Sequence, residues 1–466
     1  MNVRALLVTT GALALAACAA GPAPVIETPA PDLPATYFFQ PRSEVEAGLA
    51  ALLPADDPAY AALAEQALAA SPRVAEAAAR IEQARAGAGL AGASRLPSIW
   101  ANASVTGSRT NPSQFSAALP PGVSIDAEQI AYGANLTARW DPDIFGRLRA
   151  QERAALARID AANASARGVR LALLAEIAAS VIDWRTLAAR EIELQSDLAS
   201  AQRLADLSGS RERAGVAPGF DRVRAESAAA SSRSRLEALA SERARILGRL
   251  VTLSAQDVAQ VSRALSQVAP PARLPAAPST LPSELLVNRP DIVAAAAELA
   301  AEDAELAAAA RRRFPVFDLS ATIGLLAYGL GGLFDAESLV GSLAASVAAP
   351  LVDFGRIQAE IDGAAAAKAA AFERYRSAVY TALGDAESGY ALVAAADREA
   401  LAADEEAQKL ERAARLADTR YRAGLADFLT VLEARRAADA SGDRRAAALG
   451  RAHRARVLLW QALGGS

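Results

Sequence analysis

Four segments of the chain alternate apolar and polar residues with a period of two, the pattern of β-strands that have one apolar and one polar face. They cover residues 99–106, 132–140, 317–323 and 342–349. Each is about eight to ten residues long, the length of a strand in a transmembrane β-barrel. A half-buried strand of a soluble sheet shows the same pattern, so the pattern alone predicts strands but not their surroundings.

The stretches between these segments are rich in Ala, Leu, Glu and Arg and nearly free of proline, which favours helices because proline costs about 3 kcal/mol in a helix interior. The expected helices are 72–95, 147–208 and 219–253 in the first half of the chain and 290–313, 356–420 and 427–463 in the second. In each half, the two shorter helices placed end to end would match the longest one, at roughly 90 Å. The pattern therefore predicts a long, narrow, mainly α-helical structure with a β-hairpin in each half.

The two halves of the chain are copies of one another. Their matching landmarks are Pro72 and Pro290, Pro97 and Pro315, residues 145–147 and 354–356, and residues 213–215 and 422–424. The spacing is 218 residues before the hairpin loop and 209 after it, so the loop is nine residues shorter in the second copy. The predicted organisation is a first repeat at 59–253, a Pro-rich linker at 254–282 and a second repeat at 283–466.

The N-terminus has the pattern of a secretion signal, with Arg4 before an uncharged apolar stretch that is too short to span a bilayer. Residues 1–17 are the expected signal peptide. The sequence Leu-Ala-Ala at 15–17 precedes Cys18, the only cysteine, and resembles a bacterial lipobox. This predicts a covalent lipid on Cys18 and a tether at 18–58, the alternative being a free cysteine. By resemblance to bacterial lipoproteins, the absence of Asp after Cys18 indicates the outer membrane.

Composition and charge exclude several classes of function. A chain of 466 residues that is 52% hydrophobic can bury a large core. Its net charge of −4 gives no basic footprint for nucleic acid. One cysteine cannot form an internal disulfide, and the single histidine, His453, cannot make a metal site. We expect no metal, no cofactor beyond the lipid on Cys18, and no catalytic residues, and therefore no enzyme.

The number of predicted strands requires several copies of the chain. Four strands cannot close a barrel, and open sheet edges are not tolerated in lipid. Three copies would supply twelve strands, whereas the eight strands of two copies would leave too narrow a bore. The charge-free segment 319–334 could instead be a membrane helix, but four glycines within it argue against this. The prediction is a trimeric 12-stranded transmembrane β-barrel with four strands from each chain.

Several motifs resemble those of TolC-like outer-membrane efflux factors, in particular the lipoprotein branch that contains NodT and OprM. They are WDPDIFGR at 140–147, NRPDI at 288–292, YRAG at 421–424, VLEA at 431–434 and LLWQALGG at 458–465. Together they cover nearly the whole mature chain in the expected order. The resemblance implies a homotrimer whose outer-membrane barrel continues into a periplasmic α-helical barrel. It also implies a periplasmic adaptor and an inner-membrane pump as partners, commonly of the proton-driven RND class.

The repeated Arg-Ala-Gly turns, with Gly215 and Gly424, lie where the long helices are expected to reverse. In the family this is the periplasmic end that opens and closes, and acidic residues just past the second turn often form a selective ring there. The matching positions here carry Thr430 and Glu433. With Thr430 at this position, the second copy lacks one of the acidic rings that the resemblance implies.

Three further residues near these turns are aperture candidates with a structural alternative. Asp221 occupies the position in the first copy that matches Thr430 in the second, and Asp427 lies nearby. Both aspartates could simply be first-turn acids favoured by the helix dipole, and Glu433 could be a solvated helix residue. Tyr421 could join the closing contacts or only pack.

Three function classes remain: an export duct, a structural coiled-coil lipoprotein or adhesin, and a periplasmic hydrolase. The scaffold would not need duplicated hairpins of barrel type, and the hydrolase should show a catalytic constellation. We therefore interpret the chain as the outer-membrane channel of a tripartite efflux system, which passively conducts what its pump supplies. The duct of a type I protein secretion system is the alternative within this class.

Overall fold

The computed structural model describes residues 25–41, 48–109, 111, 128–269 and 273–465. It consists of two compact units, each with segments from both predicted repeats. The described residues of the sheet unit lie within 25–28, 82–160 and 297–373, and those of the helical unit lie within 29–81, 161–296 and 374–465. The two units are defined by packing in space, whereas the predicted repeats are defined by the duplication of the sequence. The bounds of the units therefore do not test the predicted bounds of the repeats. The signal peptide and Cys18 lie outside the described residues.

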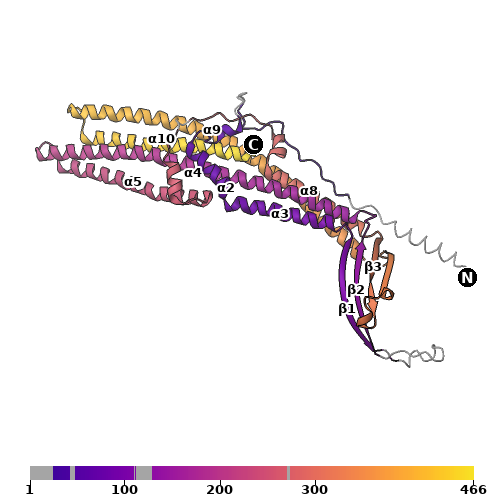
Figure 1. Ribbon diagram of the computed structural model, residues 1–466. Coiled ribbons are helices and arrows are strands. Elements are labelled where there is room, and N and C mark those ends of the chain that lie inside the picture. Colours follow the sequence, from indigo (N-terminus) through magenta and orange to yellow (C-terminus); the bar gives the residue numbers. More distant parts are fainter. Residues whose placement is uncertain (1–24, 42–47, 110, 112–127, 270–272, 466) are drawn as a thin grey trace, which may run out of the picture. The chain divides into compact units, whose positions relative to one another are not determined.

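Apart from α6, which has no counterpart in the second half, the order of helices and strands in the described residues is the same in both halves of the chain (Figure 1). The first half contains α2 (Pro58–Ala70), α3 (Pro72–Ala93), β1 (Ser98–Arg109), β2 (Glu128–Trp140), α4 (Arg147–Arg213), α5 (Gly219–Ser254) and α6 (Val258–Leu265). The second contains α7 (Leu285–Asn288), α8 (Pro290–Arg311), β3 (Val316–Ala327), β4 (Leu339–Ala348), α9 (Arg356–Arg422) and α10 (Phe428–Ala462). Short 3-10 turns cover Leu49–Leu52, Pro282–Glu284, Leu330–Gly332 and Ala336–Ser338. The duplicated pattern of helix, hairpin, long helix and return helix is confirmed.

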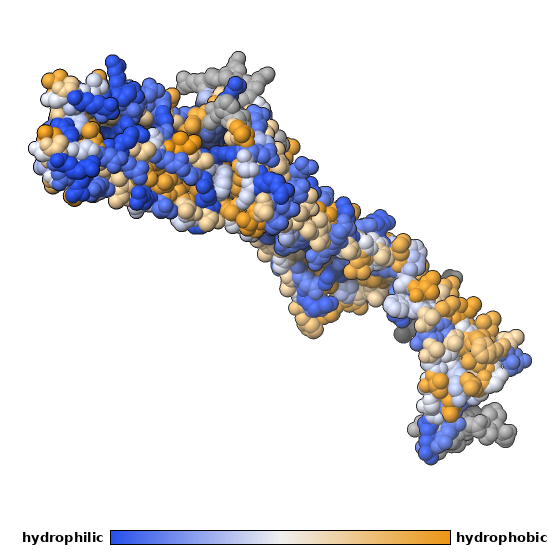
Figure 2. Space-filling model, turned by 60° about the vertical axis from the view of Figure 1, so that its left-hand side comes forward, coloured by the Kyte–Doolittle hydropathy of each residue, from blue (hydrophilic) through white to orange (hydrophobic). Residues whose placement is uncertain are grey.

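The four strands form one antiparallel sheet in the order β1-β2-β3-β4. The register brings apolar residues opposite one another, as with Leu136 and Ile323. The residues of this apolar face include Ile99, Ala101, Ala103 and Val105 of β1, Tyr132, Leu136 and Trp140 of β2, Leu319, Ile323 and Leu325 of β3, and Leu339, Leu343 and Val347 of β4. Figure 2 shows apolar residues gathered over the sheet. The predicted separation into an apolar and a polar face therefore holds across all four strands.

The seam between the two hairpins requires a glycine. A Cβ atom at Gly324 would lie 2.5 Å from the Asn135 Cβ and closer still to the Ala134 carbonyl oxygen. Two residues away, the Thr137 and Thr322 hydroxyls lie 3.3 Å apart on the polar face.

Residues 316–327 form a strand, and the alternative of a membrane helix at 319–334 is wrong. Among the helices of the described residues, none is both long enough and apolar enough to cross a bilayer.

The helical unit has a core to which α2, α4, α5, α9 and α10 contribute. Leu63, Ile177, Leu250, Tyr390 and Leu459 are among its fully buried side chains. Small residues allow close packing of these helices. A Cβ atom at Gly450 on α10 would overlap the Thr186 side chain on α4, so this side chain packs directly against the backbone of α10.

The described end of the predicted tether packs on the helical unit. Tyr37 is only 4% exposed, and its ring lies 5.3 Å from that of Tyr390. The backbone N–H groups of Phe38 and Phe39 donate to the Glu387 carboxylate at 2.8 and 3.2 Å. The predicted linker at 254–282 contains α6, which begins with a capping box between Asp257 and Gln260.

Candidate functional site

The two helix reversals have the same backbone geometry. Between α4 and α5, Gly215 has φ 73° and the Val216 N–H donates to the Arg211 carbonyl at 3.0 Å. Between α9 and α10, Gly424 has φ 75° and the Leu425 N–H donates to the Arg420 carbonyl at 2.8 Å. This is the Schellman pattern, in which glycine takes the left-handed conformation that other residues disfavour. The structure thus accounts for both glycines locally, and their position at an aperture stays a prediction.

The helices that follow the reversals begin differently. The Asp427 carboxylate accepts the Thr430 N–H at 2.7 Å and caps α10. Hydrogen bonds from the Thr430 side chain and backbone hold the pKa of Asp427 below its usual value. At the start of α5, Pro218 is in the capping position and offers no side-chain bond, and Asp221 lies half-buried in the first turn. Glu433 is exposed one turn further along α10 than Thr430.

Tyr421 connects three helices at the second reversal. Its side chain is 5% exposed, and its ring lies 6.2 Å from the Phe428 ring of α10 in an edge-on arrangement. The Arg211 guanidinium of α4 lies 4.7 Å from the ring centroid, a cation–π contact. The matching residue in the first copy is Glu212, which pairs with Arg222 at 2.7 Å. One reversal is therefore held by aromatic packing and the other by an ion pair.

The ends of α4, α5, α9 and α10 next to the two reversals form one small core. Its buried members are Ala201, Leu204, Ala225, Ala228, Ala417, Tyr421, Phe428, Val431 and Leu432. The predicted aperture residues therefore lie on helix ends that pack together. Sequence reasoning missed the partners Phe428 and Arg211. The seven-residue spacing of Tyr421 and Phe428 around a turn glycine was the available signal.

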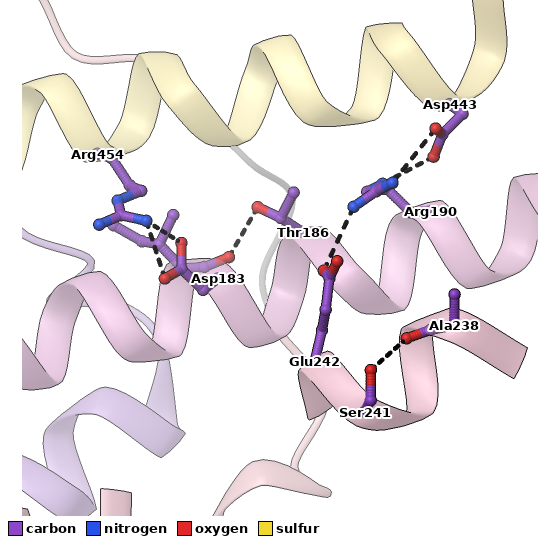
Figure 3. Close-up of polar contacts among 9 residues, drawn as sticks. Asp183, Thr186, Arg190, Ala238, Ser241, Glu242, Asp443 and Arg454 are labelled. Carbon is purple, nitrogen blue, oxygen red and sulfur yellow. Dashed lines mark hydrogen bonds and ion pairs between the residues drawn. The ribbon is translucent and has the colours of Figure 1, made fainter. Parts of the chain in front are cut away.

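A series of ion pairs joins α4 to α10 further from the reversals than this core. Arg190 binds Asp443 at 2.7 Å, and Arg454 binds Asp183 at 2.9 Å (Figure 3). Arg190 also faces Glu242 of α5 at 3.6 Å. Ion pairs therefore recur along the contact between α4 and α10.

One pair in this seam consists of two acids, Asp197 of α4 and Asp439 of α10. Asp197 is 6% exposed. Burial, and next the charge of Asp439, raises the pKa of Asp197 to about 8. Burial also raises the pKa of Asp439. A proton on Asp197 allows its carboxyl group to hydrogen-bond to that of Asp439, as in other buried acid pairs. The sequence signal was an acid on the buried stripe formed by Leu194, Ala201 and Leu204.

The chain thus consists of two helix-hairpin-helix repeats that share one four-stranded sheet with an apolar and a polar face. The sequence profile of the family described as outer membrane efflux protein matches residues 63–256 and 281–465. The chain therefore belongs to the outer membrane efflux protein family.

Three known proteins illustrate the similarity. The pyoverdine export outer membrane protein OpmQ of Pseudomonas aeruginosa is 31% identical over 100% of this chain and 97% of its own length. The outer membrane protein OprJ of the same species is 30% identical over 76% of this chain and 73% of its own. The structure of the outer-membrane channel OprN superposes with a TM-score of 0.85 at 28% identity, covering 95% of this chain and 98% of that one.

Membership of this family identifies the export duct among the three function classes. The protein is the outer-membrane channel of an efflux system and extends into the periplasm. Channels of this family are trimeric and work with an adaptor and an inner-membrane pump. The family is one of channels and efflux ducts.

Proposed function

We propose that the protein is the lipid-anchored exit duct of a tripartite pump that is driven by the proton gradient and belongs to the RND class. Three chains would close a 12-stranded barrel in the outer membrane, and their helix reversals would form the periplasmic aperture. The observation that carries the proposal is the two-faced sheet. Within the described part of the chain, β1 and β4 each pair on one side only, so two open edges require further strands.

The apolar face of the sheet is uncovered within one chain. Ile99 is 71% exposed, Val105 is 69% exposed and Leu343 is 85% exposed. Such a continuous apolar surface needs an apolar environment. Lipid supplies it if the opposite, polar face lines a water-filled bore.

The height of the apolar band fits an outer membrane. On β2 it extends from Ile130 to Trp140, and the exposed ion pair between Arg109 and Glu128, at 3.4 Å, lies beyond its outer end. Ten residue steps at 3.4 Å make about 34 Å along the strand. A tilt of about 40° reduces this to about 26 Å, close to the 25 Å apolar band of outer-membrane barrels.

The anchor and the aperture belong to the same proposal. A lipid on Cys18 would add membrane affinity to that of the barrel. Replacing Cys18 by Ser should remove radiolabelled palmitate from the protein, and persistent labelling would refute the assignment.

The proposed aperture lies at the helix reversals. Its residues are Asp221, Tyr421, Asp427, Thr430 and Glu433. Their clustering on the packed helix ends supports this.

The proposed cargo is small molecules, supplied by the pump. This is supported by the names of relatives, among them a toluene efflux pump outer membrane protein and a pyoverdine export outer membrane protein. A strain without this gene should accumulate a hydrophobic fluorescent dye, and the intact gene should reverse this. A protonophore should abolish the rescue while ATP is maintained by fermentation. Unchanged dye levels together with the loss of a secreted protein would instead support type I secretion.

Conduction is the direct test of the duct itself. Purified trimer in a planar bilayer should give discrete single-channel steps. A structural lipoprotein would give none, and the absence of steps in a folded trimer at any voltage would contradict the proposal.

A further inference from the structure

The polar face of the sheet carries few large side chains, and three of them lie at the end from which α4 continues. The face consists mostly of small residues: Ser98, Asn102, Ser104 and Thr106 of β1, Gly133, Asn135 and Thr137 of β2, Ser320, Thr322 and Gly324 of β3, and Ser342, Ala344 and Ser346 of β4. Against this background Trp100, Arg139 and Asp318 stand out in size or charge.

The strand register places these three residues in successive layers of the same face. Arg139 lies opposite Ser98 on β1 and Ser320 on β3. Asp318 lies opposite Ser346, one layer nearer the helices, and Trp100 lies opposite Thr137, one layer further into the sheet. Two residue steps separate successive layers, so the three layers span about 14 Å along the strands.

Folding of the chain does not explain the charges. Arg139 and Asp318 are both exposed, and neither forms an ion pair within 4 Å among the described residues. They are the only charged residues of the four strands on the polar face. The other two charged strand residues, Arg109 and Glu128, lie on the apolar face at the outer end and pair with each other. Trp100 is 68% exposed, although indole rings are usually largely buried.

We propose that Trp100, Arg139 and Asp318 form a selectivity band on the inner wall of the barrel at its periplasmic end. This inference rests on the proposed function, because it requires the polar face to line the bore. The trimer would then hold three arginines, three aspartates and three indoles in consecutive layers. Trp100 narrows the bore, and the two sets of opposite charges beside it act on the charge of a passing solute.

The balance of charges determines how each substitution should act. With three positive and three negative groups, the band is close to neutral. Removing the arginines leaves three negative charges, which attract cations, and removing the aspartates leaves three positive charges, which attract anions. Charges about 10 Å from a solute in 0.1 M salt are partly screened, so each change should shift the cation-to-anion permeability ratio by about twofold. At 1 M salt the screening length is about 3 Å and the shift should vanish.

The test is the reversal potential of single channels under a KCl gradient in planar bilayers. Arg139→Gln should raise cation preference, Asp318→Asn should raise anion preference, and the double variant should return close to the original value. Arg139→Lys should retain the original value because it keeps the charge. Trp100→Ala should increase the conductance by widening the bore. The matched control is Arg109→Gln, which removes the same charge from the outer end of the apolar face and should change nothing.

The outcomes separate this inference from the proposed function. If the unaltered protein conducts and Arg139→Gln and Asp318→Asn leave the reversal potential unchanged, the band does not exist although the duct does. An equal shift from Arg109→Gln would also overturn the inference, since that side chain does not face the bore. A folded trimer without any conductance would refute the duct itself. The exposed positions of the substituted residues make loss of folding a minor concern, which the yield of trimer checks.

Discussion

The buried acid pair between α4 and α10 should make the stability of the helical unit depend on pH. The pKa of Asp197 is raised from 3.8 to about 8 by burial and then by the charge of Asp439. The folded chain therefore keeps a proton that the unfolded chain releases above about pH 4. The stabilisation is fully present below the unfolded-state pKa and is lost as the pH rises through the folded-state pKa.

The size of the effect follows from the linkage of proton binding and folding. One proton held only by the folded state changes the free energy of unfolding by 1.36 kcal/mol per pH unit. Between pH 6 and pH 8 the loss is therefore at most about 3 kcal/mol for each chain. The other charged groups around the pair are Arg235, Arg435, Glu193 and Glu411. Arginine side chains stay charged throughout this range.

The informative variant is Asp197→Asn, because an amide resembles the protonated acid in shape and can donate a hydrogen bond to Asp439. We expect its stability advantage over the unaltered protein to grow between pH 5.5 and about pH 8, because the unaltered chain loses up to about 1.36 kcal/mol for each pH unit in this range and the amide does not titrate. The assay is thermal unfolding of the detergent-solubilised trimer, followed by circular dichroism at one fixed scan rate across this pH range, since such unfolding is often irreversible.

The control for this experiment is Asp206→Asn, the same change at an exposed position of the same helix. It should shift the unfolding temperature equally at every pH. Contributions from His453 are common to all variants and cancel in the differences. The reasoning is refuted if the difference between Asp197→Asn and the unaltered protein does not grow as the pH rises.

Three further predictions concern the sheet seam, the second reversal and the aperture. Gly324→Ala should prevent β2 and β3 from pairing and abolish the folded trimer, whereas Gly341→Ala, whose Cβ would lie 3.6 Å from the Thr322 carbonyl oxygen, should be tolerated; equal trimer yields in gel filtration would contradict this. Gly424→Ala forces alanine into φ 75° and should lower the free energy of unfolding by about 1 kcal/mol, which a denaturant titration of the trimer can detect or exclude. Glu433→Ala should weaken any cation preference in bilayer recordings, and an unchanged preference removes Glu433 from the aperture ring.

Much of the fold could be predicted from the sequence because the signals were local and repeated. Alternation in the strands fixes which residues share a face, as the pairing of Leu136 with Ile323 shows. Scarcity of proline marks the helices, and α4 and α9 extend to Arg213 and Arg422, past the predicted ends at 208 and 420, because their glycine turns come later.

The contacts of the candidate site could not be predicted, because they join residues far apart in the chain. Asp197 and Asp439 meet only once α4 and α10 pack, and a carboxylate on a helix more often faces solvent. The same holds for Tyr37, whose segment reads as a proline-rich tether but packs against Tyr390. Local patterns describe faces and ends of helices, whereas these contacts depend on which helices become neighbours.

The central claim is that the four-stranded sheet is completed only by two further copies of the same chain. Native mass spectrometry of the detergent-extracted protein tests it most directly. The expected result is one species of three chains, each 48.1 kDa before any processing. A stable, folded species with the mass of a single chain would contradict the claim.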